Sequence, residues 1–202
     1  MTITLETLNR IDDGTTDLLF RDAHTVYSFS DRPVFDSEIE HAYELMKWAP
    51  TAMNLQSLRI VLVESDEAKA RLLPHLAEGN RAKAGSAPVV AILAADTNFH
   101  DNLPRVLPQA PAAKDMFADA TLREQTARFN ATLQAGYFLI ALRAVGLHAG
   151  PMGGFDSVGL DADLLAGSAL KSFLVVNIGH PAEGGTFPRN PRLAADEVVT
   201  SL

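Results

Sequence analysis

The chain of 202 residues contains no cysteine. Disulfides, thiolate nucleophiles and metal centres with cysteine ligands are therefore excluded, so any chemistry must use other groups. No apolar run approaches the roughly 20 residues that a membrane-spanning helix needs. The N-terminus also lacks the basic stretch followed by an apolar one that is typical of export signals. We expect a soluble cytoplasmic protein with no membrane partner.

Positive charge is scarce as well. Lys and Arg number 17 against 25 Asp and Glu, which gives a formal net charge of −8. Binding to a nucleic-acid backbone needs clustered Lys and Arg, and the sequence shows no such cluster. We therefore expect no nucleic-acid partner, and any anion must be bound by a local group of residues.

The motifs of several common enzyme classes are missing. There is no G-x-G-x-x-G after an apolar run, no Walker loop, no G-x-S-x-G and no H-x-x-x-H pair. The histidines are scattered singly, which is more typical of surface or locally bonded histidines than of metal ligands, so we expect no metal. They are His24, His41, His75, His100, His148 and His180.

Apolar residues make up 47% of the chain, enough to bury the core of one domain. We predict a single domain over residues 1–202, in which about 186–202 form a C-terminal arm with too little apolar material to fold alone. Three apolar runs indicate buried strands of a central sheet. They are residues 60–63, 88–95 and 173–178.

Two helices are indicated by the spacing of apolar residues. A capping box of Ser37 and Glu40 begins the first, and Pro50 ends it. The second runs from about 122 to 145 and is stopped by Gly146. Its second half is apolar almost all round, so it is buried either in the chain's own core or in a subunit interface, and we favour a homodimer. One stripe of this helix carries Phe129, Leu133, Tyr137, Ile140 and Ala144.

A loop between the first helix and the first strand carries two primary amides, Asn54 and Gln56. Each amide offers both donors and an acceptor, which suits a planar heterocycle whose edge alternates carbonyl and N–H groups. Alternatively, both amides cap the backbone of their own loop. The sequence leaves the two interpretations open.

Two further groups would make sense around one flavin-like cofactor. Asn80 and Lys83 share a helical face, and a lysine can stabilise negative charge on a reduced flavin. A solvated lysine is the simpler interpretation. The glycines in the turn of residues 150–154 permit a ligand to approach the backbone closely, although Gly-Pro and Gly-Gly pairs also mark ordinary loops.

The remaining group is basic and lies near the two ends of the chain. Arg189 and Arg192 have guanidinium groups that suit phosphate oxygens, and His24 and Thr25 could add to them. Two exposed arginines are otherwise simply solubilising. The joint occurrence of all these groups favours one cofactor site.

Several of these segments resemble the motifs of a known protein family. Residues 50–56, Pro-Thr-Ala-Met-Asn-Leu-Gln, resemble the P-S-S-x-N-x-Q flavin loop of the nitroreductase family of FMN-dependent oxidoreductases, and the resemblance covers nearly the whole chain. Within the family, the chain most resembles the malonic semialdehyde reductase branch. This closer likeness is carried by Gly150-Pro151-Met152 with Gly154-Phe155-Asp156, by Ala166-Gly167-Ser168 with Leu170-Lys171-Ser172, and by Pro191-Arg192-Leu193.

The resemblance implies an α+β fold, a nitroreductase-like sandwich with a mixed central sheet flanked by helices and a C-terminal arm exchanged in a homodimer. It also implies two FMN sites between the subunits. The phosphate would be held by His24, Thr25, Arg189 and Arg192. The partner subunit would supply Thr51, Asn54 and Gln56, while Asn80 and Lys83 would line the pyrimidine edge. Pro151, Met152, Gly153 and Gly154 would lie near flavin N5, and Asn130 is a weaker member of the set.

The sequence departs from the family pattern at three places. His24 stands where an arginine is usual, Tyr27 falls near the place of a second basic residue, and Thr51 with Ala52 replaces paired serines. These departures bear on the strength of phosphate binding.

The activity implied is that of an FMN-dependent NAD(P)H oxidoreductase. NADH or NADPH would deliver hydride, and a small acceptor would collect it in ping-pong fashion: a semialdehyde such as malonic semialdehyde, a nitroaromatic or a quinone. No catalytic side chain is expected, because the flavin carries the hydride. Two alternatives remain: a dimeric flavin-binding or flavin-sensing protein without turnover, and an interaction protein without a cofactor. Residues 99–117, including His100, Met116 and Phe117, form either a pocket roof or a surface helix.

Overall fold

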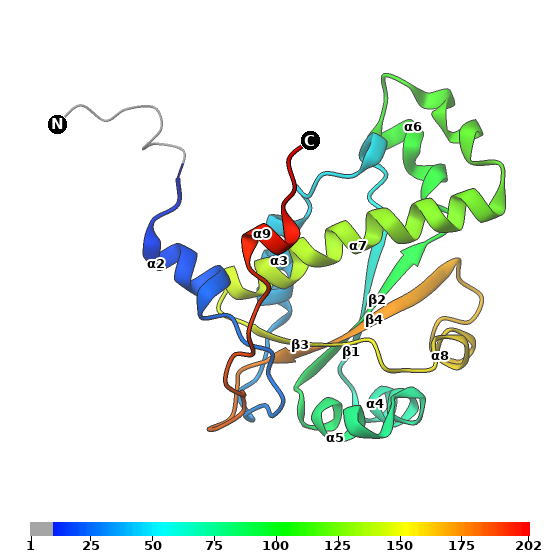
Figure 1. Cartoon of the computed structure of the whole chain (residues 1–202). Helices are drawn as coiled ribbons and strands as arrows, with labels where there is room; N and C mark the ends of the chain where they lie inside the picture. The colour runs from blue at the N-terminus through cyan, green and yellow to red at the C-terminus, as the bar shows by residue number, and fades with distance from the viewer. Residues whose placement is uncertain (1–9) are drawn as a thin grey trace.

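Four strands form one sheet in the computed structural model, which describes residues 10–202 (Figure 1). The strands are β1 (Leu58–Val63), β2 (Val89–Asp96), β3 (His148–Met152) and β4 (Leu170–Gly179), in the order β1-β2-β4-β3. All three neighbouring pairs are antiparallel, so the expectation of a mixed sheet is wrong for the described residues. Residues 1–9 of the predicted domain lie outside them.

The two central strands explain why the sheet could be recognised from apolar runs. Every residue of β2 is buried, because helices cover both faces of the sheet. Alternate side chains enter two separate cores: Leu93 belongs to the upper core and Ile92 to the lower. The three predicted strands are confirmed as β1, β2 and β4, and β3 was not predicted.

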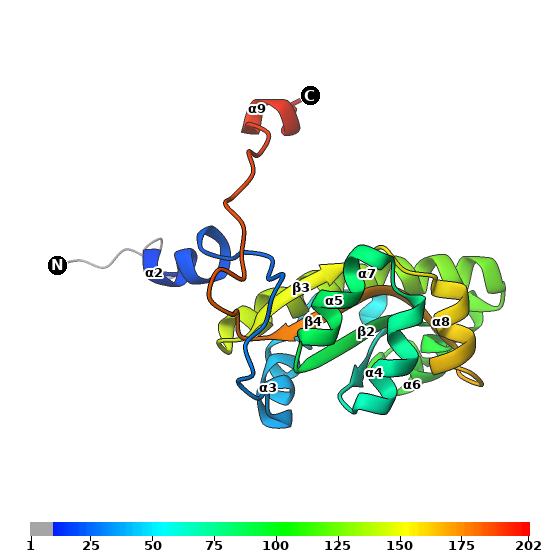
Figure 2. The ribbon, with the colours of Figure 1, turned by 90° about the horizontal axis from the view of Figure 1, so that it is seen from below.

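The helices divide between the two faces of the sheet (Figures 1 and 2). On the upper face in Figure 1 lie α3 (Asp36–Met46), α7 (Ala120–Ala144) and the short α6 (Leu103–Val106). On the lower face lie α4 (Asp66–Leu72), α5 (Glu78–Ser86) and α8 (Ser157–Leu164). The remaining short elements are α2 (Asp13–Thr16), η1 (Asp17–Arg21), η2 (Ala52–Asn54), η3 (Leu73–His75), η4 (Phe99–Asn102), η5 (Pro111–Phe117) and α9 (Ala195–Val198).

Helix α3 begins differently from the sequence prediction. The Glu38 carboxylate accepts a hydrogen bond from the backbone N–H of Phe35 at 2.9 Å, which satisfies a donor ahead of the first turn. The helix therefore starts at Asp36 and Ser37 lies inside it, so the predicted capping box of Ser37 and Glu40 is wrong.

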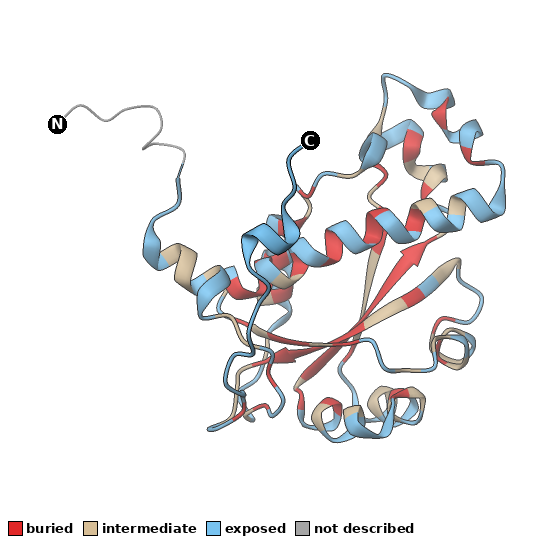
Figure 3. Ribbon diagram, in the orientation of Figure 1, coloured by how far each residue is buried: buried red, intermediate tan, exposed pale blue. Residues whose placement is uncertain are grey.

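Helix α7 confirms the long helix, and of the two expected ways to bury its apolar stripe it excludes the chain's own core. Its inward face is built from small and polar side chains such as Ala127, Ala131 and Ala135, together with Phe138. The large apolar residues of the predicted stripe lie on the outside (Figure 3). Phe129, Leu133, Tyr137 and Ile140 are 66%, 43%, 47% and 37% exposed. The chain's own core therefore does not bury this stripe.

The C-terminal segment leaves the body of the molecule. All residues from 186 to 202 are exposed, and α9 follows an extended segment without regular secondary structure (Figures 2 and 3). Exposed apolar side chains on it include Leu193, Val198 and Val199. This segment has the form expected of an arm that packs on another surface.

Within residues 10–202 no helix combines the length and the apolar character that crossing a bilayer requires.

Candidate cofactor site in two halves

The loop between α3 and β1 holds an unusual backbone. Met53, Asn54 and Gln56 have φ angles of 50°, 56° and 46°, and they are the non-glycine residues with positive φ in the described part of the chain. Left-handed backbone costs an L-residue about 1–2 kcal/mol. Three such residues within four positions must be held in place by surrounding contacts, and such strain is typical of functional sites.

The two amides of this loop bond partly to protein. The side-chain N–H of Asn54 donates to the Val106 carbonyl at 2.8 Å, and Gln56 donates to the Asn54 side-chain oxygen at 3.0 Å. Thr51 accepts from the Gln56 backbone N–H at 3.3 Å. Neither amide side chain bonds to the backbone of its own loop, so the predicted capping role is wrong for the described residues, and these bonds instead fix the direction in which the Gln56 amide is presented.

Polar side chains beneath the loop tie it to α7. Asn130 accepts from the Ala52 backbone N–H at 2.8 Å and donates to the Thr126 carbonyl at 2.9 Å. Gln134 accepts from the Leu58 N–H at 3.0 Å. Asn130 is 1% exposed, so it lies under the loop and not on the ligand-facing surface where the resemblance placed it.

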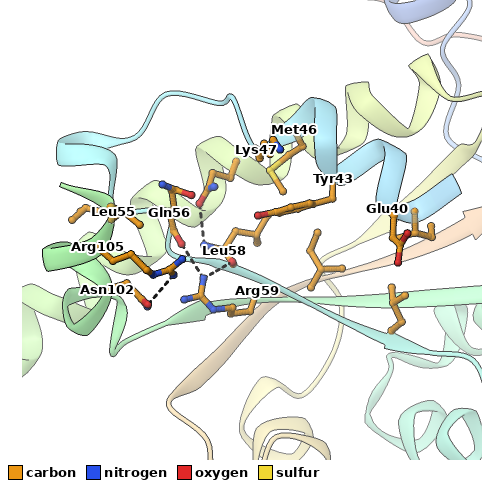
Figure 4. Close-up of a pocket in the computed structure, with 15 residues that line it drawn as sticks. Glu40, Tyr43, Met46, Lys47, Leu55, Gln56, Leu58, Arg59, Asn102 and Arg105 are labelled. Carbon is orange, nitrogen blue, oxygen red and sulfur yellow. Dashed lines mark hydrogen bonds between the residues drawn. The ribbon is translucent and has the colours of Figure 1, made fainter. Parts of the chain in front are cut away.

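A cavity of about 540 Å³ opens beside the loop, between α3, β1 and the segment around α6 (Figure 4). Its floor is apolar, and the Tyr43 ring lies along it. Gln56 stands at its edge near Arg59 and Arg105, and Glu40 also lines the cavity. Arg59 is neutralised by Asp96 at 2.5 Å, whereas Arg105 donates to the neutral Asn102 side chain.

The predicted roof residues do not line this cavity. Phe117 is buried against Phe99, with ring centres 4.9 Å apart, and Met116 is 64% exposed. Asn102, Arg105 and Val106 of the same stretch do line it. Residues 99–117 therefore border a cavity, but through other side chains than those named from the sequence.

A second group of predicted residues gathers around the N-terminal segment of residues 21–30. The Val26 N–H donates to the carbonyl of Ala149 in β3 at 3.2 Å, and the Tyr27 N–H donates to the Gly185 carbonyl at 2.8 Å. The segment thus runs between β3 and the stretch that follows β4, which brings residues near both ends of the chain together.

Lys83 and two aromatic residues meet on this segment. The Lys83 ammonium lies 5.1 Å from the centre of the Tyr27 ring, a cation–π contact. The Tyr27 ring in turn meets Phe187 edge to face, with centres 4.6 Å apart. The His24 ring bonds to the Phe187 carbonyl at 3.1 Å. Lys83 is therefore held in a defined place, which favours the functional interpretation over that of a freely solvated lysine.

The Gly-Pro turn proved to be the end of a strand. Gly150, Pro151 and Met152 lie in β3, at the edge of the sheet, where a proline is tolerated. The Met152 side chain is buried in the lower core, so only its backbone could face a ligand. Gly153 and Gly154 leave the strand exposed.

Asn80 holds the exposed end of this turn. Its side chain donates to the Gly154 carbonyl at 2.8 Å, and the Ala77 N–H donates to the same oxygen at 3.0 Å. A Cβ atom at Gly153 would meet nothing within 4 Å. The turn therefore presents fixed, bare backbone on the same side of the sheet as Lys83.

The predicted phosphate ligands are brought together only in part. Arg189 donates to the carbonyls of Arg21 and Ala23, the latter at 2.9 Å, next to His24 and the exposed Thr25. Arg192 instead bonds to the carbonyls of its neighbours Asn190 and Pro191. Arg192 is thus outside this group in the single chain.

The two halves of the predicted site lie on opposite faces of the sheet (Figure 1). Leu55, in the loop, packs into the upper core, whereas Ala84 of α5, Val26 and Met152 pack into the lower core. The sheet separates the Thr51–Gln56 loop from Lys83 and the 150–154 turn. One chain by itself therefore does not close a site from both halves.

A half-buried histidine, His148, lies at the start of β3. The Arg143 guanidinium of α7 donates to His148 Nδ1 at 2.7 Å and to the Leu18 carbonyl at 3.0 Å. Burial, the nearby positive charge of Arg143 and His180 lower the pKa of His148 from its usual 6.5 to about 4. His148 is therefore neutral at physiological pH and accepts the Arg143 hydrogen bond, which helps to fix the N-terminal segment to the body.

Comparison with known proteins agrees with this architecture. A model described as "Nitroreductase family" matches residues 21–180, well over half of the chain. The chain belongs to the nitroreductase family.

Relatives within the nitroreductase family are close in sequence. The chain is 49% identical over 193 residues to a Streptomyces griseus protein named "Putative NADH dehydrogenase/NAD(P)H nitroreductase", covering 95% of this chain and 98% of that protein. A Streptomyces coelicolor protein of the same description is 53% identical over 182 residues, and the alignment covers 90% of this chain and 90% of that protein. None of the names points to a semialdehyde, so the malonic semialdehyde branch stays a prediction.

The fold is shared with solved structures of this family at lower identity. A crystal structure of a nitroreductase-like protein from Exiguobacterium sibiricum, in complex with FMN, aligns with a TM-score of 0.82 at 16% identity, covering 96% of this chain and 99% of the other. Such identity shows the fold alone.

Several residues of the site were missed by sequence reasoning. Tyr27 was noted only as a departure from a basic residue, and nothing in the sequence announced its contact with Lys83. Gln134 could have been found, because it lies four residues after Asn130 and the pair occupies the small-residue face of α7. The sequence prediction considered only the large apolar stripe of α7 and not this face.

Proposed function

We propose that this nitroreductase-family protein is an FMN-dependent NAD(P)H oxidoreductase that works as a homodimer and reduces a small acceptor. FMN would supply a two-electron carrier able to take hydride from a nicotinamide and pass it on. The names of the curated relatives, which include NADH dehydrogenase and NAD(P)H nitroreductase, support the choice of donor.

The residues near β3 fit FMN. Lys83 has no carboxylate partner among the described residues, so its charge is available to the pyrimidine edge, where Asn80 stands beside it. Gly153 and Gly154 offer bare backbone to the N5 region, with Pro151 and the backbone of Met152 beneath them. Thr25, His24 and the unused N–H groups of Arg189 form a compact polar group suited to a phosphate.

The observation that carries the proposal is the separation of the two halves. The outward stripe of α7 exposes large apolar side chains that a monomer would leave in water, which marks an interaction surface. Pairing of two copies through this stripe would let the partner's loop, with Thr51, Asn54 and Gln56, reach the Lys83 side of the first copy. Within the C-terminal segment of residues 186–202, Phe187 and Arg189 contact the chain's own N-terminal segment. The part beyond them, with Arg192, would be exchanged as an arm in the same dimer.

The chain's own groups would position and polarise the cofactor. Lys83 would place a fixed positive charge where negative charge gathers on reduction, and the Asn80–Gly154 hydrogen bond would keep the turn from moving away. Because the open face at Gly153 is one surface, donor and acceptor would use it in turn, which predicts ping-pong kinetics. A semialdehyde, a nitroaromatic or a quinone would fit such a mechanism.

A second candidate, a flavin-binding protein without turnover, is favoured by one observation. His24 and Arg189 already use hydrogen-bonding groups on backbone carbonyls, and His24 replaces an arginine. Weak phosphate binding would suit a sensor better than an enzyme that keeps its cofactor.

The visible absorption spectrum of the purified protein, before and after anaerobic addition of NADH or NADPH, tests both candidates. A flavin spectrum that bleaches with either nucleotide supports the oxidoreductase and identifies the donor. Flavin that stays oxidised supports the binding protein. Absence of flavin even with excess FMN overturns both and favours an interaction protein without a cofactor.

A further inference from the structure

We propose that Asn130 and Gln134 are positioning residues that hold the loop of residues 51–57 in the shape that reaches the cofactor. The inference rests on the proposed function, in which this loop serves the site of the partner subunit. Asn130 is thereby moved from the cofactor-contacting set to a supporting role, and Gln134 gains a role that the sequence did not indicate.

The first reason is the state of the loop backbone. Met53, Asn54 and Gln56 all adopt left-handed φ angles without being glycine, so the loop would relax to another shape if it were not tied down. The internal bonds of Asn54 and Gln56 join the loop to itself and to Val106, but they do not anchor it to the sheet or to a long helix.

The second reason is the set of bonds that do anchor it. Asn130 accepts a hydrogen bond from the Ala52 N–H at 2.8 Å, and Gln134 accepts one from the Leu58 N–H at 3.0 Å. The two residues therefore anchor the loop near both ends. Ser57 adds a bond from its hydroxyl to the Ala127 carbonyl at 2.8 Å. All three side chains are at least 96% buried, so water cannot replace the bonds if they are removed.

The third reason is where the anchors sit on α7. Asn130 and Gln134 are one turn apart on the inward face, directly after Phe129 and Leu133 of the outward stripe. One rigid helix thus carries the loop on one side and the proposed dimer surface on the other. The position of the loop relative to the partner subunit is then set by α7 and not by the loop itself.

Substitutions that delete or keep single anchors provide the test. Gln134→Met removes the acceptor at nearly the same volume, whereas Gln134→Glu keeps an oxygen that can accept from Leu58. Asn130→Leu removes the bond to Ala52. The control is Leu142→Ala, a cavity about two turns beyond Gln134 in the same helix, which lowers stability without removing either anchor bond.

Two measurements are made on the full-length protein: amide hydrogen exchange, and the dissociation constant for added FMN. Asn130→Leu and Gln134→Met should accelerate exchange at Ala52 and Leu58 by at least ~10-fold while β2 and β4 stay protected. The same variants should weaken FMN binding by ~10-fold or more. Gln134→Glu and Leu142→Ala should stay within about two-fold to three-fold of the wild-type FMN constant.

Faster loop exchange with unchanged FMN binding would overturn the inference, as would equal losses in Gln134→Met and Gln134→Glu, because packing alone would then explain both. Failure of the proposed function looks different. If the wild type takes up no FMN, the proposed function falls, and the exchange data alone decide whether α7 holds the loop.

Discussion

Lys83 is the residue on which the electrostatics of the proposed site depend most. In a chain of formal charge −8, its ammonium is held over the Tyr27 ring and has no carboxylate to neutralise it among the described residues. A cation kept in place without a counter-ion attracts an anionic ligand more strongly than a mobile surface lysine does. The aromatic contact also explains how a tyrosine can replace a basic residue here, since it steadies a charge instead of adding one.

Lys83→Ala should therefore weaken FMN binding by about an order of magnitude, roughly 1.4 kcal/mol, because the charge at the pyrimidine edge is lost. Flavin fluorescence during titration with FMN measures it. The exposed Lys171→Ala, which makes the same change in net charge elsewhere, serves as the control and should bind as the wild type does. Equal affinities in both variants would remove Lys83 from the site.

His148 makes stability depend on pH at the same scale. Its pKa is lowered to about 4 in the folded protein, by burial first and by Arg143 next, whereas the unfolded chain keeps the usual 6.5. Between these two pH values, His148 is protonated in the unfolded state but stays neutral in the folded state. The free energy of unfolding therefore falls as the pH drops through this window.

His148→Gln keeps an acceptor for Arg143 but does not titrate. Its melting temperature should fall less steeply than that of the wild type between pH 6.5 and 4. Thermal unfolding across this range, with the exposed His41→Gln as the comparison, checks the prediction. Parallel curves for wild type and His148→Gln would show that His148 does not carry the effect.

At the scale of elements, the sequence predicted what depends on apolar periodicity. β2 and β4 are covered on both faces, so their runs are continuous and easily recognised. β3 was missed because Gly150 and Pro151 are typical of turns, and only the arrangement of the sheet shows that an edge strand tolerates them. The stripe of α7 was found, and both of its possible coverings, the chain's own core and another chain, were left open with the second favoured, since periodicity does not distinguish them.

The candidate site was predictable to the same degree. Asn54, Gln56, Asn80 and Lys83 were found by residue type and resemblance, and all of them make specific contacts. Gln134 was not named from residue type or resemblance, and only its spacing of four residues from Asn130 on the small-residue face of α7 could have indicated it. The resemblance gave Asn130 as a weaker member of the cofactor set, and its burial under the loop was not indicated, since a motif records spacing and not burial.

Gly150 shows why β3 needs a glycine. A Cβ atom there would lie 2.6 Å from the backbone carbonyl oxygen of Val26, so any side chain would push the N-terminal segment off the strand. Gly150→Ala should cost about 1–3 kcal/mol of unfolding free energy and weaken FMN binding, because Thr25 and Tyr27 move with Val26. Chemical denaturation and FMN titration measure the two effects.

The matched control is Gly85→Ala in α5. A Cβ atom at Gly85 meets nothing within 4 Å, so an alanine should be neutral or raise stability by about 0.5–1 kcal/mol through helix propensity. Equal behaviour of the two variants would mean that the segment of residues 21–30 yields without cost.

At the scale of the whole molecule, three features remain unexplained by a single chain. The proposed cofactor residues are split across the sheet, a stripe of large apolar side chains faces outward, and the C-terminal residues 190–202 are all exposed. The proposed two-fold dimer through α7 would account for all three, since an interface of this kind repeats each contact twice and would complete both sites at once. Assembly and cofactor binding should then be linked.

Leu133→Glu puts a charge in the middle of the stripe and should convert the dimer to a monomer, because an unpaired carboxylate cannot be buried there cheaply. The same variant should lose FMN affinity by ~10-fold or more, although Leu133 lies on the opposite side of α7 from the loop. Light scattering after size-exclusion chromatography gives the mass.

The single tryptophan, Trp48, is 78% exposed and lies just before the loop, so its emission reports whether a partner covers it. Val158→Glu, at a 79% exposed apolar residue of α8, is the control and should remain dimeric with FMN bound. A monomeric Leu133→Glu protein that still bound FMN as tightly as the wild type would show that one chain builds the whole site, and the division of the site between subunits would be wrong.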